Sequence, residues 1–172
     1  MSRLHAVTLP SPLGELAIVC SPAGVIATVF DGEAGESVAR IELTLEGRLT
    51  GEPTDARELA AAARREARAY FAHRSRTFTV PADLVLVGSA FSRRVLAAVA
   101  TIPYGELWTY GDVAGMAGSP RAARAAGSAL ASCPIELFVP CHRVVHAGGT
   151  IGGYGRHEDH KRWLLRHEGA IA

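Results

Sequence analysis

Residues 135 to 145 read Ile-Glu-Leu-Phe-Val-Pro-Cys-His-Arg-Val-Val. The apolar run before Pro140 predicts a short buried strand or extended segment. Pro140 cannot donate a ladder hydrogen bond, and it fixes the backbone where the cysteine follows. This arrangement would hold the Cys141 thiol rigidly in a concave site, where a basic neighbour can activate it as a nucleophile. The competing interpretation is a buried cysteine that serves only as a small apolar side chain.

The composition of the chain fits a folded protein of one domain or two small ones. Its 172 residues are 48% apolar and 20% charged, as in globular proteins. No apolar run approaches the length of a membrane span, and the N-terminus lacks the basic start and apolar stretch of a secretory signal. We therefore expect a cytoplasmic protein with no membrane partner.

The cysteines argue against a disulfide framework. Cys20, Cys133 and Cys141 are odd in number and widely spaced, which fits a reducing cytosol. No CxxC pair is present, and His157 and His160 belong to a charged, exposed loop, so no metal site is predicted. The sequence indicates no cofactor.

The charge is distributed unevenly between the two halves. Residues 1–87 carry 9 basic and 11 acidic side chains (9 − 11 = −2), whereas residues 88–172 carry 9 and 6 (9 − 6 = +3), for a net charge of +1. This mild asymmetry is compatible with nucleic-acid binding by the second half and does not establish it.

The first half reads as β-structure followed by a helix. Turn signals rich in proline and glycine separate strands predicted over residues 4–9, 16–20 and 25–30. Residues 38–45 are ambiguous between strand and helix. Apolar residues at helical spacing predict a helix over 55–73, and residues 78–86 return to strand character. A domain boundary is expected near residues 87–89.

The second half reads as a series of helices. One is predicted over residues 91–101, with Ser89 or Ser92 as its cap, and a short one over 109–117. After Gly118, Ser119 would cap a further helix that has Pro120 in its first turn and continues to residue 130. Two short helices joined by a glycine turn have the sequence shape of a helix-turn-helix, although many helical hairpins share it.

The last of these helices is rich in small residues, which allow close approach to another surface. Tight packing against a neighbouring helix is the alternative to nucleic-acid binding. Arg121 and Arg124 would lie on one face at three-residue spacing, which favours a polar partner such as phosphate.

Taken together, these motifs resemble the O6-alkylguanine-DNA alkyltransferases, also called methylated-DNA–protein-cysteine methyltransferases. The match is dense from about residue 88 onward and looser before it, through Ser11-Pro12-Leu13-Gly14 and the strand pattern. The segments that carry it are Ile102-Pro103-Tyr104-Gly105-Glu106, Tyr110, Arg121-Ala122-Ala123-Arg124-Ala125, Pro140-Cys141-His142-Arg143-Val144, Gly153-Tyr154-Gly155, Lys161, Trp163-Leu164-Leu165 and Glu168.

The resemblance implies an α/β fold with two domains. Residues 1–87 would form an RNase-H-like N-terminal domain. Residues 88–172 would form a mostly helical C-terminal domain that contains a winged-helix-type DNA-binding unit and the alkyl acceptor.

The resemblance also implies a reaction: irreversible, single-turnover transfer of the alkyl group from O6-alkylguanine in DNA to Cys141, after the nucleotide is flipped out. Glu168 would orient His142, which draws the proton from Cys141 through a water. Tyr110 would donate a hydrogen bond or proton toward the leaving guanine. An alkyl group on the guanine oxygen lies inside the base stack, so extrusion is required, and its cost is lower for a poorly paired lesion.

The remaining implied roles concern DNA and the alkyl pocket. Arg124 would enter the duplex where the nucleotide rotates out, together with a DNA-binding set of Arg121, Ala125, Gly127 and Ser128. The substrate pocket would include Leu130, Val144, Val145, Tyr154, Gly155 and Lys161. The partner would be double-stranded DNA containing O6-alkylguanine, bound by a monomer, with cooperative assembly on DNA left open.

The sequence departs from the family pattern at three places. Cys133 stands where relatives usually have asparagine, and a buried small residue is favoured there over a second reactive thiol. Ala131 replaces a common arginine, and residues 156–160 are bulkier than usual. For Arg143 a structural ion pair is favoured over a catalytic role.

Two alternative functions remain. One is a lesion-binding member of the same family with impaired transfer. The other is a Cys-His hydrolase unrelated to DNA, which leaves the arginine-bearing helix without an explanation.

Overall fold

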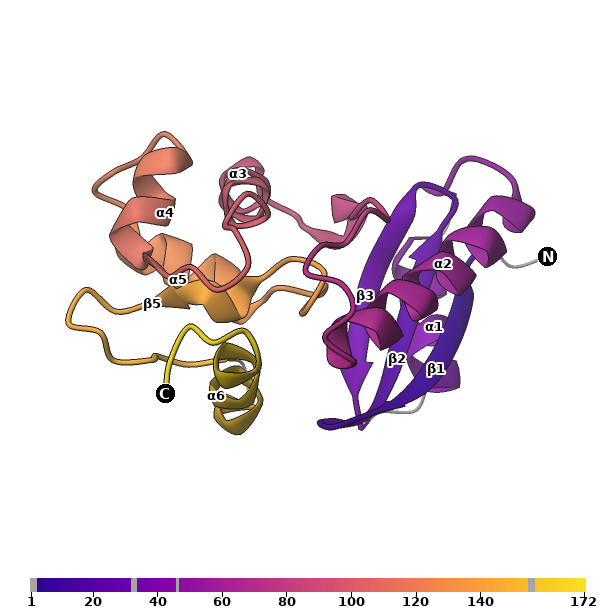
Figure 1. The fold of residues 1–172 in the computed structure, drawn as a ribbon. Helices are drawn as coiled ribbons and strands as arrows, with labels where there is room; N and C mark the ends of the chain where they lie inside the picture. The colour runs from indigo at the N-terminus through magenta and orange to yellow at the C-terminus, as the bar shows by residue number, and fades with distance from the viewer. Residues whose placement is uncertain (1–2, 32–33, 46, 155–156) are drawn as a thin grey trace. The chain divides into compact units, whose positions relative to one another are not determined.

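The chain forms two compact units in the computed structural model, residues Met1–Leu86 and Val87–Ala172. The structure describes residues 3–31, 34–45, 47–154 and 157–172 (Figure 1). No helix of this described part is long and apolar enough to cross a membrane.

A three-stranded antiparallel sheet forms the centre of the first unit. Its strands are β1 (His5–Ser11), β2 (Gly14–Ser21) and β3 (Gly24–Phe30), in that spatial order, close to the three predicted strands. The tight turns begin with serines: Ser11 Oγ donates to the carbonyl of Gly14 at 2.6 Å and accepts from the amide of Leu13. Gly14 follows with φ +96°, a conformation that favours glycine.

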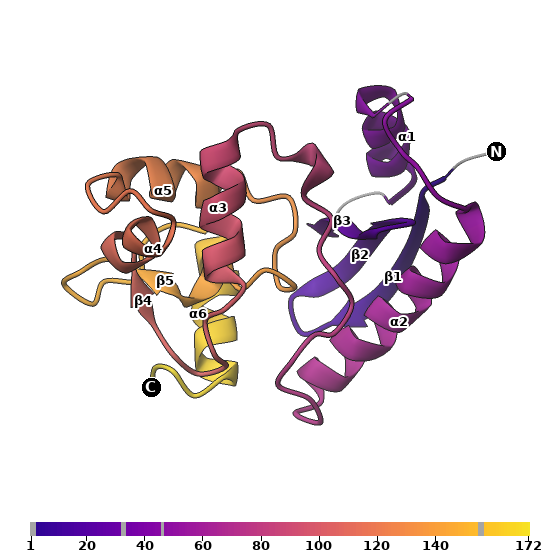
Figure 2. The same ribbon diagram turned by 90° about the horizontal axis from the view of Figure 1, so that it is seen from above.

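Two helices cover the sheet. They are α1 (Ala34–Thr44) and α2 (Pro53–Phe71), and Figure 2 shows them on opposite faces. Residues 16 to 20 of β2 are all fully buried, as expected for a central strand covered on both sides. A stripe of buried small residues lets α2 lie close to the sheet: Ala56, Ala60, Ala63 and Ala67. The predicted helix over 55–73 is therefore confirmed, and residues 38–45, left ambiguous by the sequence, are mostly helical.

The strand expected over residues 78–86 is wrong. This segment makes only an isolated bridge between Val25 and Ala82, and it ends in a short 3-10 turn, η1 (Leu84–Leu86). Pro81 has no amide hydrogen to continue a ladder. Asp83 Oδ1 accepts from the amide of Val85, which turns the chain instead.

In its described residues, the second unit is built from four helices and two very short strands. Its first elements are α3 (Ala90–Val99), β4 (Trp108–Thr109) and α4 (Tyr110–Met116). They continue with α5 (Ala123–Ala131), the 3-10 turn η2 (Cys141–Arg143), β5 (Val144–Val145) and α6 (Glu158–His167). Ser89 caps α3 by accepting from the amide of Ser92, and Thr109 forms a capping box with Asp112 at the start of α4.

The helix that carries Arg124 begins later than predicted. It starts at Ala123, with no side-chain cap, and Ser119 and Pro120 belong to a turn closed by the amide of Ala122 donating to the carbonyl of Ser119. The amide of Ser119 itself donates to Ala114 and so closes the end of α4. Arg121 therefore lies before the helix, and the expected shared face with Arg124 is wrong.

The apolar run before Pro140 is not a strand. It forms a tight reversal, in which the amide of Val139 donates to the carbonyl of Ile135 and Glu136 bridges to Val139. Leu137 has φ +76° and is almost completely buried. The run is still apolar because it turns inside the core.

Candidate active site

A parallel pairing of two short strands sets the position of the Pro140-Cys141-His142-Arg143 motif. Trp108 pairs with Val144 and Thr109 with Val145. Tyr110 follows directly after β4, and Cys141 to Arg143 form the 3-10 turn that leads into β5. This pairing brings together Tyr110 and Cys141, which are far apart in sequence.

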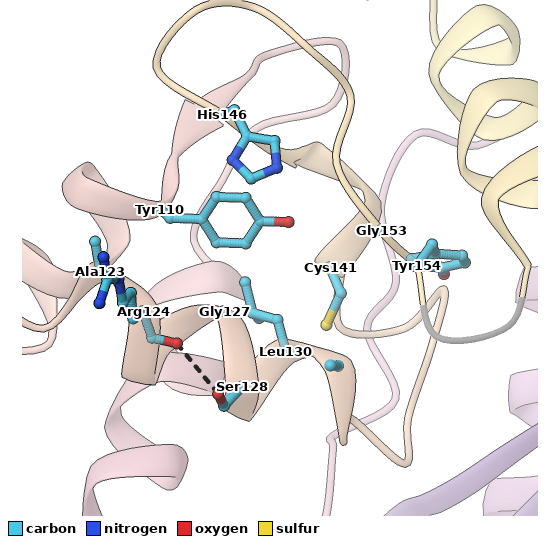
Figure 3. Close-up of a pocket in the computed structure, with 11 residues that line it drawn as sticks. Tyr110, Ala123, Arg124, Gly127, Ser128, Leu130, Cys141, His146, Gly153 and Tyr154 are labelled. Atoms are coloured by element: carbon cyan, nitrogen blue, oxygen red, sulfur yellow. Dashed lines mark hydrogen bonds between the residues drawn. The ribbon is translucent and has the colours of Figure 1, made fainter.

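Cys141 and Tyr110 line the same pocket, which has a volume of about 500 Å³. The Tyr110 hydroxyl points toward the side of the pocket that holds Cys141 and Tyr154 (Figure 3). The α5 helix forms the opposite wall. The complete lining is Tyr110, Ala123, Arg124, Gly127, Ser128, Leu130, Ala131, Cys141, His146, Gly153 and Tyr154.

Behind the cysteine lies a buried ionic network. His142 Nε2 lies 2.8 Å from Glu168 Oε1, and Arg143 donates to both carboxylate oxygens of Glu168, each at 2.8 Å. Arg143 also donates to the carbonyl of Ile102, and the amide of Gly105 donates to Glu168. Burial works to raise the pKa of Glu168, but hydrogen bonds from His142 and Arg143 hold it well below its ordinary value.

The network fixes the tautomer of His142. Burial lowers the pKa of its imidazole, so the ring is neutral near neutral pH. The ionised Glu168 can only accept hydrogen bonds, so Nε2 must carry the ring hydrogen. Nδ1 then keeps a free lone pair, and it has no hydrogen-bond partner among the residues that the structure describes. His142 can therefore accept a proton at Nδ1.

A second buried cation supports the loop that carries Tyr154. Lys161 is completely buried, and its Nζ donates to the carbonyls of Val144 and Gly153. Burial lowers its pKa to about 8. The positive charge of Lys161 favours the thiolate of Cys141, which makes Lys161 an electrostatic neighbour of the sulfur as well as a brace for the backbone.

The Tyr110 side chain is clamped between backbone and an imidazole. A Cβ atom on Gly152, which has φ +76°, would lie 2.8 Å from the Tyr110 hydroxyl, so the loop approaches closer than any other residue permits. The ring of His146 lies 5.1 Å from the ring of Tyr110. Burial raises the pKa of Tyr110, and negative charge on Cys141 adds to the effect, so the hydroxyl stays protonated.

Cys141 itself is buried in an environment that opposes ionisation. Its pKa is raised well above the ordinary value, first by a hydrogen bond with the thiol of Cys133, then by burial and by the charges of Cys133 and Glu136. Burial raises the pKa of Glu136 to about 7. The resting side chain is therefore a thiol, and it needs a base to become a nucleophile.

The structure brings together most of the residues singled out from the sequence. Tyr110, Arg124, Gly127, Ser128, Leu130, Cys141 and Tyr154 line the pocket. His142, Glu168, Lys161, Val144 and Val145 are buried without lining it. Arg121 and Ala125 are exposed and lie outside the lining. Gly155 lies outside the described residues, as does Arg156 of the bulky loop.

Sequence reasoning missed three contributors to the site. His146 lines the pocket beside Tyr110, and no local pattern marked it. Glu136 was given no role, although its charge raises the pKa of Cys141. Ala123 forms part of the wall because it is the first residue of α5. Arg143, by contrast, forms the structural ion pair that was favoured for it.

The described residues contain no group of three or more histidine, cysteine or acidic side chains that could hold a metal ion.

Comparison with known proteins gives consistent matches over most of the chain. Residues 90–170 match the family model described as 6-O-methylguanine DNA methyltransferase, DNA binding domain. A methylated-DNA–protein-cysteine methyltransferase of Mycolicibacterium paratuberculosis is 40% identical over 88% of this chain and 90% of its own. A protein of the same name from Shigella flexneri is 36% identical over 99% of both chains.

Solved structures agree with the sequence matches. The O6-methylguanine methyltransferase of Mycobacterium tuberculosis superimposes with a TM-score of 0.74 at 35% identity, over 98% of this chain and 94% of that one. A structure of Mycobacterium tuberculosis OGT in complex with DNA gives a TM-score of 0.75 at 35% identity, over 95% of this chain and 92% of that one. The mixed α/β fold of small sheets and helices is thus confirmed. The chain belongs to the 6-O-methylguanine DNA methyltransferase family.

Proposed function

We propose that the protein repairs alkylated DNA by direct reversal, transferring the alkyl group of O6-alkylguanine to its own Cys141. The observation that carries this proposal is a buried thiol that opens into a pocket of about 500 Å³ and is backed by the Glu168–His142 pair. The curated relatives that bear the methyltransferase name support the reaction class.

The first step of the proposed reaction activates the thiol. His142 accepts the proton of Cys141 at Nδ1, through a bridging water, while its Nε2 hydrogen stays on the bond to Glu168. Glu168 remains ionised because His142 and Arg143 hold its pKa low, so it stabilises the imidazolium that forms. Lys161 stabilises the thiolate.

The second step is displacement at carbon. The sulfur–carbon bond forms as the carbon–O6 bond breaks, and the electron pair of that bond moves onto the guanine. Tyr110 is protonated and lies in the same pocket as Cys141, so it can donate a proton toward the leaving guanine. The imidazolium of His142 holds the proton from the thiol, which balances the charge. The thioether product is stable, so each molecule acts once.

The α5 helix is the proposed contact with DNA. Its pocket side carries Ala123, Gly127 and Ser128, and a Cβ on Gly127 would lie 3.7 Å from the Tyr110 ring. Since an alanine would fit against Tyr110, the small size at this position is better explained by close approach to a duplex. Arg124 is exposed at the rim and would fill the space that the flipped nucleotide leaves.

We further propose that residues 1–87 form an RNase-H-like domain and residues 88–172 a DNA-binding domain of the winged-helix type. The antiparallel sheet beneath α2 supports the first assignment. The α4–α5 pair, joined by a turn that contains Gly118 at φ +81°, supports the second. Arg121 and Ala125 would contact the phosphate backbone. Val144, Val145, Gly155 and Lys161 would complete or support the alkyl pocket. The partner is a duplex containing O6-alkylguanine, bound by a monomer.

Mass spectrometry tests the reaction directly. The reduced protein is mixed with one equivalent of duplex that carries O6-methylguanine, and intact protein and peptides are weighed. We expect one methyl group on the peptide that contains Cys141 and restored guanine in the DNA. Cys141→Ala should bind the same duplex and gain no methyl group. The oligomeric state of the free and DNA-bound protein is measured by light scattering.

The same experiment separates the main alternative, a lesion-binding protein with impaired transfer. One observation favours that alternative: the Cys133 thiol raises the pKa of Cys141 and so opposes its reactivity. A protein that retards the alkylated duplex on a gel and yet keeps its unmodified thiol would replace the transfer proposal with this one.

A further inference from the structure

The helix α2 and the turn after it carry a positive charge that the net charge of the first unit conceals. Residues 57–76 hold six arginines and two glutamates (6 − 2 = +4). The rest of residues 1–86 holds three arginines and nine acidic side chains (3 − 9 = −6). The unit is therefore acidic as a whole and has one basic segment, and a local charge of this kind attracts a polyanion even where the net charge does not.

Four of these arginines form a stripe along α2. Arg57, Arg64 and Arg68 recur at spacings of seven and four residues, which places them in line on one side of the helix. Arg65 lies beside this line. All four side chains are exposed, because α2 packs on the sheet through a different side, made of small buried residues. From Arg57 to Arg68 the stripe covers about 16 Å, at the helical rise of 1.5 Å per residue.

Nothing in the described part of the chain neutralises this stripe. None of its four side chains has a hydrogen bond or an ion pair with a described residue. No acidic residue stands three or four positions from any of them, the spacings at which helical ion pairs form. One of the two glutamates of the segment, Glu66, is engaged elsewhere, since its carboxylate accepts from the amides of Thr79 and Val80.

The stripe reduces the stability of the helix that carries it. Arg68 stands four residues from Arg64 and three from Arg65, and like charges at these spacings repel each other. The helix dipole favours a cation in the last turn, which accounts for Arg68. It does not account for Arg57, Arg64 or Arg65, which lie before that turn. Folding alone therefore does not explain the stripe, and a negatively charged partner does.

We propose that the arginine stripe, Arg57, Arg64, Arg65 and Arg68, is a second DNA-binding surface, which holds the phosphate backbone of a duplex without reading its sequence. One strand of B-DNA carries a phosphate about every 3.4 Å along the axis, so a stripe of about 16 Å spans several phosphates. Guanidinium groups bind phosphate through paired, charge-assisted hydrogen bonds. The choice of DNA as the polyanion rests on the proposed function.

This surface would act separately from α5 and the pocket. Backbone contacts supply affinity for any duplex, damaged or not, and they allow a protein to slide along DNA. Loss of the stripe should therefore weaken binding to undamaged and alkylated duplexes alike. The reaction of Cys141 with a free alkylated base should not change, because no residue of the stripe lines the pocket.

The salt dependence of binding to a long undamaged duplex tests the proposal. Fluorescence anisotropy gives the dissociation constant of the full chain at a series of salt concentrations. In the triple variant Arg64→Gln, Arg65→Gln, Arg68→Gln, the slope of log K against log [salt] should become shallower by about 2–3, since each lost phosphate contact removes about 0.9. An unchanged slope would overturn the proposal and leave the arginines as a solvated face.

Matched variants show whether charge at this place is responsible. Lysine at the same three positions keeps the charge and should keep the slope. Arg40→Gln removes an exposed arginine from α1, on the other face of the sheet, and should leave the slope unchanged (Figure 2). A shallower slope in the lysine variant, or a change in Arg40→Gln as large as that per arginine of the stripe, would contradict the proposal.

The glutamine variants should fold, because glutamine and arginine have similar helix propensities, and thermal unfolding checks this. If the triple variant does not fold, the single change Arg64→Gln still decides the question, with an expected change in slope of about 0.9.

A paired transfer assay separates the stripe from the proposed function. Wild type and triple glutamine variant are each mixed with free O6-methylguanine, and methyl transfer to Cys141 is measured. Equal transfer by the two proteins, together with a shallower slope in the variant, supports both proposals. A shallower slope in a protein that transfers no methyl group overturns the proposed function and leaves the stripe. Methyl transfer with equal slopes overturns the stripe alone.

Discussion

The two units bury different kinds of side chain. In the described part of residues 1–86, the buried polar side chains are the neutral Ser21 and Ser37. In the described part of residues 87–172 they are His142, Arg143, Lys161 and Glu168. A buried ionic network often costs more in desolvation than its attractions return. The sheet unit therefore has a core selected for packing, whereas the helical unit gives up stability to surround one thiol with fixed charges.

The largest expected effect comes from Glu168→Gln. This change leaves the buried Arg143 without its carboxylate partner, and the free energy of unfolding should fall by about 3–5 kcal/mol. The substitution should also slow methylation of Cys141 and raise the pKa of its thiol, because His142 loses the charge that stabilises its protonated form. Urea denaturation measures the first effect, and the pH profile of thiol alkylation measures the second.

Glu158→Gln, in the first turn of the α6 helix that ends just before Glu168, is the matched control. Glu158 is exposed, and its oxygen lies 3.7 Å from Arg162 in a surface pair. The free energy of unfolding should change by no more than about 0.5 kcal/mol. Equal losses for Glu158→Gln and Glu168→Gln would mean that the buried network has no special energetic role.

Leu16→Ala tests the packing of the sheet unit, residues 1–86, which is the other half of the comparison. Leu16 lies in β2 and is fully buried, so a cavity should lower the free energy of unfolding by about 2–5 kcal/mol. The pH dependence of Cys141 alkylation in the folded protein should stay unchanged, because no titrating group of the network is altered. Leu43→Ala on α1 is the control: Leu43 is 78% exposed, and its loss should cost no more than about 0.5 kcal/mol. A shifted thiol profile in Leu16→Ala would break the proposed division of roles.

Arg124→Ala should separate DNA handling from chemistry. Transfer from duplex O6-methylguanine should slow by more than about tenfold, since extrusion of a nucleotide costs a few kcal/mol that Arg124 helps to offset. Reaction with the free alkylated base should change little. Arg166→Ala is the control, because Arg166 is also an exposed arginine but lies on α6, outside α5 and the pocket lining. Equal losses on duplex and free base would assign Arg124 a structural role.

The smallest expected effect is the acid dependence of stability. The folded-state pKa of Glu168 lies below its ordinary value of 4.5, so its contribution is fully present above that value. It is lost as the pH falls through the folded-state pKa, at no more than about 1.4 kcal/mol per pH unit for one proton. Denaturation at a series of pH values should show a shallower acid decline for Glu168→Gln than for the wild type. Parallel curves would remove Glu168 as the source.

Local signals predicted the elements that depend on local physics. The Pro-Gly turns marked the three strands, and the alanine spacing marked α2. Ser119 and Pro120 have the sequence of a helix start. In the structure they form a turn instead, because the amide of Ser119 donates to the carbonyl of Ala114 at the end of α4. Hydrophobicity alone predicted a strand over residues 78–86, but Pro81 has no amide hydrogen to pair with a neighbouring strand.

The site depended more on contacts that no local pattern reveals. The adjacency of Cys141 and His142 could be read directly, but Glu168 lies 26 residues from His142, and only the family resemblance linked them. His146 lines the pocket, and the charge of Glu136 acts on Cys141. Both residues lie in loops whose path the sequence pattern did not predict. Cys133 was noted as a departure from the family pattern, but no local signal indicated that it raises the pKa of Cys141.

The turn at Leu137 has a consequence for how the protein matures. A leucine at φ +76° costs about 1–2 kcal/mol, which only the burial of its side chain in the finished core can offset. A chain still emerging from synthesis lacks that core and so leaves the turn unformed. Its Cys141 is then an ordinary solvated thiol, with neither the pocket nor the proton acceptor beside it. The proposed acceptor site is thus assembled only together with the core around Leu137, so an incompletely folded chain lacks the pocket and proton acceptor that the proposed transfer needs.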